Sequence, residues 1–464
     1  QDIGGDDNCG TMSPETFEVI LAPFESAKLT MEQTMLLIPG SYNFPLEIIS
    51  VNGTTDDDQT NNSLDKDIFV AMGSTQKIPM IEHFSSSTCG PCINVNYAMS
   101  QLTANNPGKY AYTKYPCYWP APGDPYYTDD AQSRIDFYTV GAAPQTFLDG
   151  VDQGYSAVSQ AALDAQYNTP AFANIRGAFT VEGNVINITA DFMSYFEMEN
   201  VSAYISINEE TTTGNVGNNG ETEFHHILMK MLEDGNGNTI TINAGEYVRL
   251  EYSFDMSSTH VEEMNDLEVA LWLQNPVTHE IYNSRYAYEN SEHCYPVQNL
   301  TAEFSEDGSA INLAWDAPET GTPTGYNIYI NSELIAENHP ELSYTNTELA
   351  EELYYIPTTH FVEVVAVYAD NKTSIGDMAS LSSGLKVNKV EDMNLSIYPN
   401  PAKDVVRLST DNGQQSTVRI YNILGMLVEE IEINSNETEI DVSDYNTGIY
   451  FFNIQTENGN VTKK

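Results

Sequence analysis

The chain is short of basic residues. Its 464 residues include 18 Lys and Arg against 67 Asp and Glu, which gives a formal net charge of −49. Charged residues make up only 18% of the chain, so the imbalance reflects missing bases rather than abundant acids. Nucleic-acid binding requires a basic surface that displaces phosphate counterions, and anionic membrane surfaces attract basic segments. The shortage therefore excludes nucleic acid as a partner and disfavours docking on an anionic membrane.

Long apolar runs are also missing. No window of about 18 consecutive apolar residues occurs, so we expect no membrane span. The hydrophobic fraction of 41%, with 11% aromatic residues, is nevertheless sufficient for folded cores. The length indicates about three or four domains. Because the chain starts at Gln1 rather than Met, we expect that a signal peptide has been removed.

Cysteine is scarce, and its spacing is informative. The five cysteines are Cys9, Cys89, Cys92, Cys117 and Cys294. Two of them form a Cys-Gly-Pro-Cys sequence, and the other three allow at most one further intrachain bridge. We expect a structural disulfide from Cys117 to Cys9 or Cys294 rather than a third redox thiol, and the sequence leaves the pairing open.

Residues 77–168 have an α/β pattern. Strands are predicted at 80–84, 110–115 and 145–148. A helix is predicted after Cys92, because Val95, Ala98, Met99 and Leu102 recur at helical spacing. A second helix is expected to begin at Thr128, a suitable N-cap, and to end at Gly141, and a third spans 156–167. Residues 170–290, 296–386 and 394–464 instead show short alternating strands, which is typical of β-sandwiches.

The Cys89-Gly90-Pro91-Cys92 sequence is the strongest chemical signal. At a helix N-terminus, the helix dipole and free N–H groups lower the pKa of the first thiol. Cys89 is therefore expected to be the attacking thiol and Cys92 the resolving one. Half of a zinc site is the alternative. It is disfavoured because no second Cys pair or Cys–His pair with ligand spacing occurs, and we predict no metal site.

Two segments carry a resemblance to the thioredoxin-like family. The run from Glu82 to Cys92 resembles the strand, CGPC and helix of that family, and residues 140–150 resemble its cis-proline strand. The resemblance implies a cis Ala143–Pro144 bond and a substrate strand bound beside Ala143 and Pro144. It also implies that Cys89 attacks a substrate disulfide and that Cys92 resolves the mixed disulfide.

The sequence departs from this family at two positions. Thr88 stands where the family has Trp, and His83 stands where it has a buried acid. His83 is expected either to relay protons for Cys92 or to be a hydrogen-bonded core histidine, and both readings remain open.

The flanking segments resemble modules of exported proteins. The combination of a thioredoxin-like domain with residues 170–293 resembles outer-membrane-associated proteins of Bacteroidetes. Residues 296–386 resemble a fibronectin type III domain, with Trp315 as the core anchor.

The end of the chain resembles the type IX secretion C-terminal sorting domain. The matching residues are Pro399, Asn400, Pro401, Gly425, Gly448 and Tyr450. This resemblance implies export through the outer membrane and, as partners, the type IX translocon and a sortase.

These observations predict a multidomain α/β plus all-β chain, in which a thioredoxin-like domain is followed by antiparallel β-sandwich modules. The expected segments are a β segment with an acidic linker (1–67), the thioredoxin-like domain (68–169), a β-sandwich (170–293), the fibronectin-like domain (294–388) and the sorting domain (389–464).

The expected function is thiol–disulfide exchange on a protein substrate at the cell surface or after secretion, without a cofactor. In an oxidising location, oxidase or isomerase action is favoured over reductase action. The alternative is a structural, adhesive or assembly protein with a closed CGPC disulfide. Divalent cations could bridge its acidic faces, although no calcium loop is evident: Asp234-Gly235-Asn236-Gly237-Asn238 better fits a turn.

Overall fold

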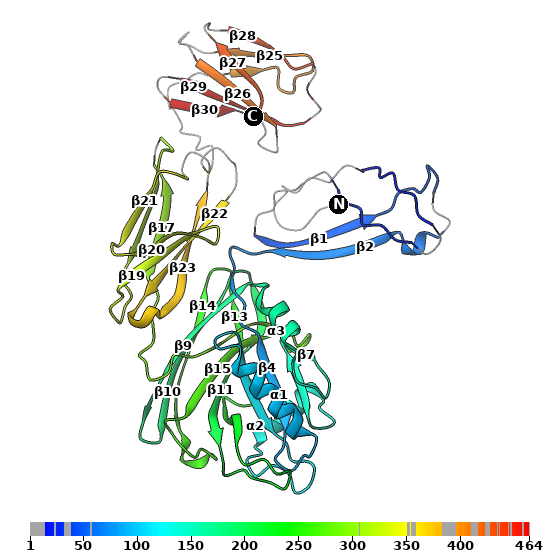
Figure 1. The fold of residues 1–464 in the computed structure, drawn as a ribbon. Coiled ribbons are helices and arrows are strands. Elements are labelled where there is room, and N and C mark those ends of the chain that lie inside the picture. The colour runs from blue at the N-terminus through cyan, green and yellow to red at the C-terminus, as the bar shows by residue number, and fades with distance from the viewer. Residues whose placement is uncertain are drawn as a thin grey trace. The chain divides into compact units, whose positions relative to one another are not determined.

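The computed structural model describes most of the chain (Figure 1). The described residues are 14–22, 25–31, 39–55, 58–305, 307–349, 353, 359–382, 396–409, 416–422, 427–433, 435, 437–443, 445, 448–456 and 459–463. The chain divides into two compact units. One comprises 1–301, 314–343 and 361–379, and the other comprises 302–313, 344–360 and 380–464. Within the described part, no helix is long and apolar enough to cross a membrane.

The N-terminal part contains one hairpin. Strands β1 (Gly40–Glu47) and β2 (Ser63–Val70) pair antiparallel. Elsewhere in the β segment predicted at 1–67, residues 14–22 and 25–31 form no strand, and residues 32–38 lie outside the described residues.

A nine-stranded sheet organises the first unit. Its order is β16-β15-β11-β12-β5-β4-β6-β7, with β13 paired to β11. The strands are β4 (Met80–Ser85), β5 (Ala111–Pro116), β6 (Gln145–Leu148), β7 (Val151–Asp152), β11 (Met198–Thr212), β12 (Phe224–Leu232), β13 (Asn238–Ile242), β15 (Leu267–Gln274) and β16 (Ile281–Tyr286). β4 runs parallel to β5 and antiparallel to β6. The sheet therefore continues across the boundary predicted at residue 169.

Three α-helices are formed in the described residues, and each follows a strand of this sheet. They are α1 (Cys92–Ala104), α2 (Asp129–Tyr138) and α3 (Gln160–Tyr167). The predicted N-cap of α2 is confirmed, because the Thr128 side chain accepts a hydrogen bond from the Ala131 N–H. The helix ends at Tyr138, three residues before the predicted end, since Thr139 adopts a left-handed conformation.

A second sheet packs with the first around an apolar core. It contains β9 (Ala173–Glu182), β10 (Val185–Ser194) and β14 (Tyr247–Asp255) in the order β14-β10-β9. The core between the sheets is built from buried side chains such as Phe192, Ile205 and Leu271. Two further short strands, β3 (Thr75–Gln76) and β8 (Pro170–Ala171), pair with each other.

Residues 298–382 form two smaller sheets. One has the order β17-β18-β21 and the other β20-β19-β22-β23. Their strands are β17 (Gln298–Phe304), β18 (Ile311–Asp316), β19 (Gly325–Ile330), β20 (Glu333–His339), β21 (Ser343–Asn346), β22 (Thr359–Val367) and β23 (Thr373–Ser382). Trp315, the predicted core anchor, is buried with its ring centroid 5.4 Å from that of Tyr326.

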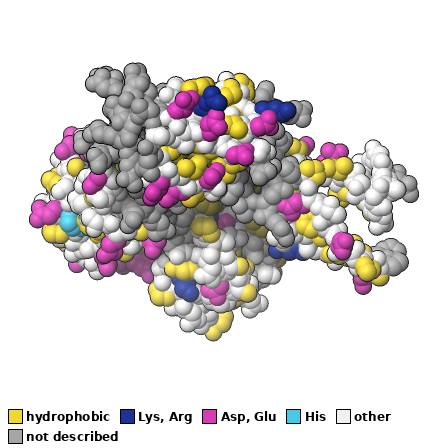
Figure 2. Space-filling view, turned by 90° about the horizontal axis from the view of Figure 1, so that it is seen from above, with side chains coloured by type: hydrophobic (Ala, Val, Ile, Leu, Met, Phe, Trp, Pro, Cys, Tyr) yellow, Lys and Arg dark blue, Asp and Glu magenta, His cyan; other side chains and the backbone are white. Residues whose placement is uncertain are grey.

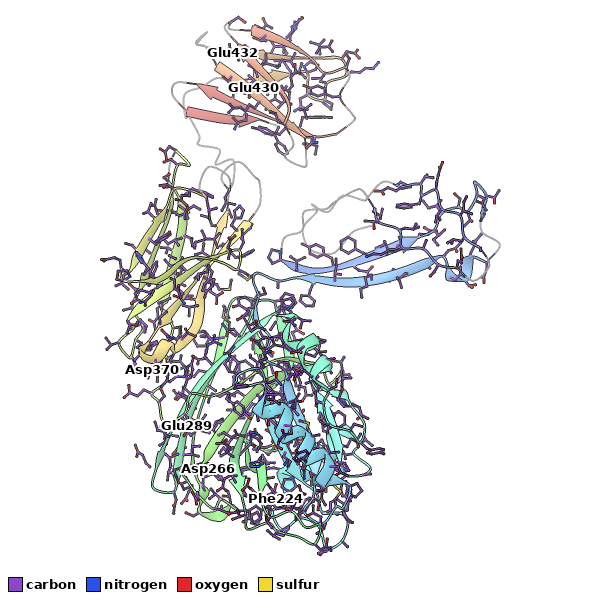
Figure 3. The ribbon with its side chains drawn as sticks, in the orientation of Figure 1. Phe224, Asp266, Glu289, Asp370, Glu430 and Glu432 are labelled. Carbon is purple, nitrogen blue, oxygen red and sulfur yellow. A yellow bond between two sulfur atoms is a disulfide. The ribbon has the colours of Figure 1, made fainter. Side chains whose placement is uncertain are left out.

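The C-terminal residues also form two sheets, ordered β24-β25-β28 and β27-β26-β29-β30. The strands are β24 (Ser396–Tyr398), β25 (Val405–Ser409), β26 (Ser416–Asn422), β27 (Leu427–Ile433), β28 (Glu437–Asp441), β29 (Tyr450–Thr456) and β30 (Gly459–Lys463). Glu430 and Glu432, labelled in Figure 3, both lie on β27. The chain is thus mostly β-sheet with several sandwich-like pairs of sheets.

A buried ion pair joins α2 to the nine-stranded sheet. Arg134 of α2 contacts Glu82 of β4 at 2.7 Å, and both side chains are almost fully enclosed. Glu82 also accepts hydrogen bonds from the hydroxyls of Tyr115 (2.8 Å) and Tyr138 (2.5 Å). The guanidinium lies 4.5 Å from the ring centroid of Tyr204, on β11. Residues on both sides of position 169 therefore surround one buried charge pair.

Replacing Arg134 by Met should destabilise the fold strongly. It leaves the Glu82 carboxylate buried without its cation, so we expect the free energy of unfolding to fall by about 3–5 kcal/mol. Chemical denaturation would measure the loss. Adding Glu82→Gln should restore part of it, since Gln removes the charge and can still bond the tyrosines. A loss below about 1 kcal/mol in the single variant, within the range of exposed pairs, would contradict the assignment.

Candidate functional site

The CGPC segment connects β4 to α1. Cys89 and Cys92 form a disulfide with an S–S distance of 2.12 Å. The Cys92 N–H at the start of α1 donates to the Cys89 Sγ at 3.2 Å. A helix N-terminus thus points at the sulfur, as the sequence predicts. Gly90 and Pro91 are exposed, whereas Cys89 is only 2% exposed.

The second predicted segment lies directly beside the disulfide. The Sγ of Cys89 is 3.4 Å from the carbonyl oxygen of Ala143. The Ala143–Pro144 bond is cis, which confirms the expected geometry. Pairing between β6 and β4 holds this segment in place, with Gln145 opposite Phe84. Residues more than fifty positions apart are therefore brought together as the sequence suggested.

His83 is buried on β4. Its Nδ1 lies 2.7 Å from the Tyr112 hydroxyl, and its Nε2 has no hydrogen-bond partner among the described residues. Burial, with a contribution from the Lys114 charge, lowers the pKa of His83 well below its usual value. His83 is therefore neutral at neutral pH, and the relay role assigned to it stays a prediction.

Lys114 is a buried charge that sequence reasoning missed. It lies opposite His83 in the β4–β5 register and is 4% exposed. Burial lowers the pKa of Lys114 to about 8, although Glu221 and Asp124 act in the opposite direction. The sequence offers one signal for this buried charge, a single lysine within the aromatic strand Tyr110–Tyr115. Because lysine is rarely buried unless it is paired, its place in such a strand indicates a carboxylate nearby.

Residues 213–223, which we call the cover segment, connect β11 to β12 and contact the CGPC loop. The Asn219 N–H donates to the Ser87 carbonyl at 3.0 Å, and its side-chain amide donates to the Cys89 carbonyl at 3.3 Å. Glu221 accepts from the Asn96 amide of α1 at 2.9 Å. A Cβ at Gly217 would lie 2.3 Å from the Ser87 carbonyl oxygen, so only glycine fits this approach.

A second loop approaches the same segment. The Thr88 hydroxyl donates to the Pro120 carbonyl at 2.7 Å, and the Asp124 carboxylate accepts from the Ser87 N–H at 2.8 Å. This loop and the cover segment hold residues 86–89 on both sides, which is consistent with the low exposure of Cys89.

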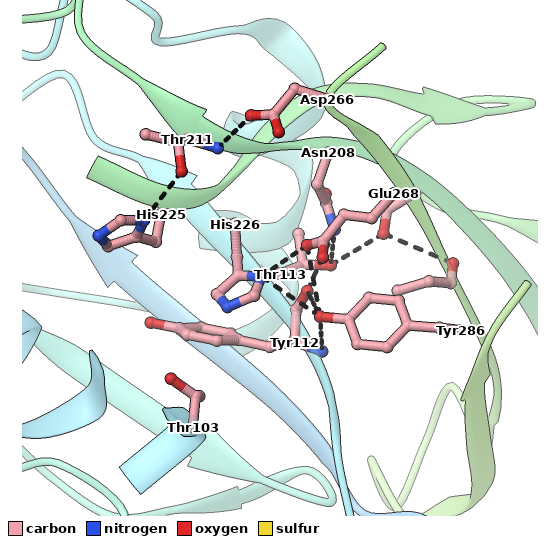
Figure 4. A network of polar contacts seen from close by, with 12 residues as sticks. Thr103, Tyr112, Thr113, Asn208, Thr211, His225, His226, Asp266, Glu268 and Tyr286 are labelled. Carbon is pink, nitrogen blue, oxygen red and sulfur yellow. Dashed lines mark hydrogen bonds and ion pairs between the residues drawn. The ribbon is translucent and has the colours of Figure 1, made fainter. Parts of the chain in front are cut away.

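Tyr112, which contacts His83, belongs to a polar network that reaches the sandwich strands (Figure 4). The Tyr112 ring lies 4.7 Å from that of His226, whose Nδ1 is 2.7 Å from the Glu268 carboxylate. The Tyr286 hydroxyl lies 3.3 Å from the same carboxylate. The network ties β5 to strands of the sandwich.

Of the two disulfides expected for Cys117, the one to Cys294 is not formed. Cys117 and Cys294 are both free, buried thiols, and Cys9 lies outside the described residues. Burial raises the pKa of Cys117 far above its usual value, so this thiol is unreactive as it stands.

The described residues contain no cluster of side chains suited to hold a metal ion. No group of three or more His, Cys, Asp or Glu suited to a metal occurs among the described residues. Figure 2 shows carboxylates dispersed over the visible face, with few Lys and Arg among them.

The residues of the predicted sorting motif lie in the C-terminal unit. Pro399, Asn400 and Pro401 follow β24, Gly448 precedes Tyr450 at the start of β29, and Gly425 lies outside the described residues.

Comparison with known proteins identifies the C-terminal segment. Residues 396–464 match the secretion system C-terminal sorting domain. This domain indicates export through the outer membrane to the cell surface or into the medium.

Two curated relatives are remote. An ulvan lyase of Nonlabens ulvanivorans is 24% identical over 158 residues, covering 34% of this chain and 28% of that protein. Beta-agarase A of Zobellia galactanivorans is 23% identical over 367 residues, covering 77% of this chain and 63% of that protein. The chain thus spans less than two thirds of the length of either relative.

Solved structures give similarly distant matches. HBP35 of Porphyromonas gingivalis has a TM-score of 0.38 at 12% identity, covering 67% of this chain and 99% of that chain. The central fibronectin-III array of RIM-binding protein has a TM-score of 0.18 at 12% identity, covering 62% of this chain and 94% of that chain.

The depressed pKa of Lys114 makes stability depend on pH. Between its folded value of about 8 and the usual 10.5, the unfolded chain holds a proton that the folded chain has lost, so unfolding becomes harder as pH rises. Below pH 8 the destabilisation is fully present. Lys114→Met should therefore be more stable than the parent chain at pH 7, and this advantage should shrink by roughly 2–3 kcal/mol at pH 10.

Urea denaturation at the two pH values measures the difference. Lys66→Met, on the exposed strand β2, is the matched control for loss of a lysine. An advantage of equal size at both pH values would show that Lys114 is not the buried charge described.

Proposed function

We propose that this exported protein catalyses thiol–disulfide exchange through Cys89 and Cys92, carried by a thioredoxin-like domain at residues 68–169. The observation that carries the proposal is the disulfide at the N-terminus of α1, with Cys89 Sγ 3.4 Å from the Ala143 carbonyl and a cis bond to Pro144. The strand order β5-β4-β6-β7, with α1 after β4, supports it.

In the oxidising direction, a substrate thiolate attacks Cys89 Sγ. The Cys89–Cys92 bond breaks, a mixed disulfide forms, and Cys92 leaves as a thiolate that takes up a proton. A second substrate thiol, deprotonated, then attacks the mixed disulfide and releases Cys89. Two electrons pass from the substrate dithiol to the protein, which is left with two thiols. In isomerisation, the reduced protein begins the cycle, and its Cys89 thiolate attacks a substrate disulfide. A substrate thiolate later displaces Cys89, so the protein ends with both thiols again.

The surrounding residues have distinct roles in this proposal. Ala143 and Pro144 present free backbone groups to an extended substrate segment beside Cys89. The Cys92 N–H, 3.2 Å from Cys89 Sγ, stabilises negative charge on that sulfur. In the tautomer whose Nδ1–H donates to the Tyr112 hydroxyl, the unpartnered Nε2 of neutral His83 is the acceptor for a relayed proton, although burial lowers the pKa of this histidine.

A structural or adhesive role is the second candidate, and the low exposure of Cys89 favours it. At 2% exposure, the sulfur cannot meet a protein substrate without movement of a neighbouring loop. In that role the disulfide closes the turn before α1 and the β modules supply binding surfaces.

Reduction under native conditions distinguishes the two candidates. The full chain is treated with dithiothreitol, and accessible thiols are counted while circular dichroism monitors folding. The proposal requires two new thiols in the folded protein, with Cys89 alkylated first. In Cys92→Ser, the Cys89 thiolate should attack a disulfide-containing peptide, release one peptide thiol and remain trapped as a mixed disulfide, whereas Cys89→Ser should form no such adduct. A bridge that opens only on unfolding would falsify the exchange function and leave the structural role.

Weakening the cover segment should accelerate reduction. Asn219→Ala removes side-chain hydrogen bonds to the Ser86 and Cys89 carbonyls. Their loss is worth ~1 kcal/mol, so we expect a rise in the dithiothreitol rate constant of roughly five- to tenfold. Asn243→Ala, at a surface loop where Asn243 bonds Glu246, is the control. Equal rates in the parent chain and both variants would mean that the cover segment does not limit access.

A further inference from the structure

Some of the basic side chains of this acidic protein are neutralised by neighbouring carboxylates. Seven of the 18 Lys and Arg form ion pairs within the described residues: Lys77, Lys109, Arg134, Lys230, Arg249, Arg407 and Arg419. Arg176, Arg285 and Lys372 form no ion pair in the described part of the chain, although each is partly buried. They are three of the described cations that lack an ion pair, and Tyr288 links them in the fold.

Tyr288 and Thr373 bring two of these cations together. The Tyr288 N–H donates to the carbonyl of Gly177, the residue after Arg176, at 2.7 Å. The Arg176 Nε donates to the Thr373 hydroxyl at 3.0 Å, and the Thr373 N–H donates to the Tyr288 hydroxyl at 3.0 Å. Lys372 Nζ lies 5.7 Å from the Tyr288 ring centroid. Arg176 and Lys372 therefore flank the same tyrosine.

Arg285 completes the cluster. It lies on β16, three residues before Tyr288, and its Nε is buried without a hydrogen-bond partner among the described residues. Burial and the neighbouring Arg176 lower the pKa of Arg285 to about 9, so the guanidinium remains charged at neutral pH. A buried charge without a partner is unfavourable unless an oppositely charged group joins it.

Nearby carboxylates do not supply that group. Glu363 is buried and bonded to the Tyr195 hydroxyl at 3.0 Å, and burial raises its pKa to about 7. Glu289 and Asp370, labelled in Figure 3, are close in sequence to Tyr288 and Lys372. Neither is ion-paired with any of the three cations in the described structure, and Glu289 accepts from the Asn290 amide instead.

We propose that Arg176, Arg285 and Lys372 form a binding site for an anionic oxygen group, either a carboxylate or a sulfate. Guanidinium groups present paired N–H donors that match the oxygens of such groups, and the lysine adds a point charge. The unpartnered Arg285 Nε is the donor that the anion satisfies. The aromatic face of Tyr288 beside the cations suits a ligand whose anionic group is attached to a ring or carbon chain.

Direct binding tests the site in the full chain. Equilibrium dialysis with radiolabelled sulfate, and in a separate arm with radiolabelled succinate, distinguishes the two forms of the anion, with chloride at matched ionic strength as background. We expect saturable binding of at least one anion, and a rise in the unfolding midpoint that follows occupancy. Arg285→Gln should weaken binding at least tenfold, whereas Arg285→Lys should retain part of it.

Two further variants serve as controls. Arg419→Gln removes an ion-paired arginine elsewhere and should leave binding unchanged. Glu289→Gln removes a competing negative charge and should strengthen it. The proposal is overturned if neither anion binds above the chloride background, or if Arg285→Gln and Arg285→Lys both bind as the parent chain does.

Discussion

The pairing of β12 with β5 is the constraint on which the candidate site depends. Ile227 lies opposite Lys114 in this pairing, which joins the strands around the CGPC segment and those of the sandwich into one sheet. Because β12 lies beside β5, the cover segment that precedes it reaches Ser87 and Cys89. The same arrangement brings Tyr204 and Trp272 against Arg134. The exposure of the disulfide is therefore set by a part of the chain outside the segment that carries it.

Local pattern predicted several features within residues 77–168. The helix after Cys92 and the cap at Thr128 have short-range signals, the cis bond at Pro144 was implied by the resemblance to the thioredoxin-like family, and each is found. The cover segment has no such signal. Asn219 and Glu221 lie in a polar connection whose sequence is typical of an ordinary loop. Their contacts with the CGPC loop and α1 depend on strand pairing between residues more than a hundred positions apart. The Cys117 bridge failed for a related reason, because spacing does not reveal which thiols a sheet will enclose.

The scarcity of basic residues shapes the interior as well as the surface. Burial raises the pKa of Asp149 to about 6 even beside Lys77, and that of Glu209 to about 7 where backbone N–H groups are its stabilising partners. With few cations available, some buried carboxylates, such as Glu209, rely on backbone N–H donors instead of an ion pair.

The charge balance near His83 is also shared between distant segments. A carboxylate at this position would pair with Lys114 along the sheet, but burial keeps His83 neutral. The groups that hold a proton on Lys114 are instead Glu221, in the cover segment, and Asp124, in the second loop. Withdrawal of the cover segment removes the Glu221 contribution and brings water closer to Lys114, two changes that shift the Lys114 pKa in opposite directions. Movement of the cover segment and the protonation of Lys114 are therefore thermodynamically linked. The net change in the Lys114 pKa depends on how far β5 stays shielded from water when Cys89 becomes accessible.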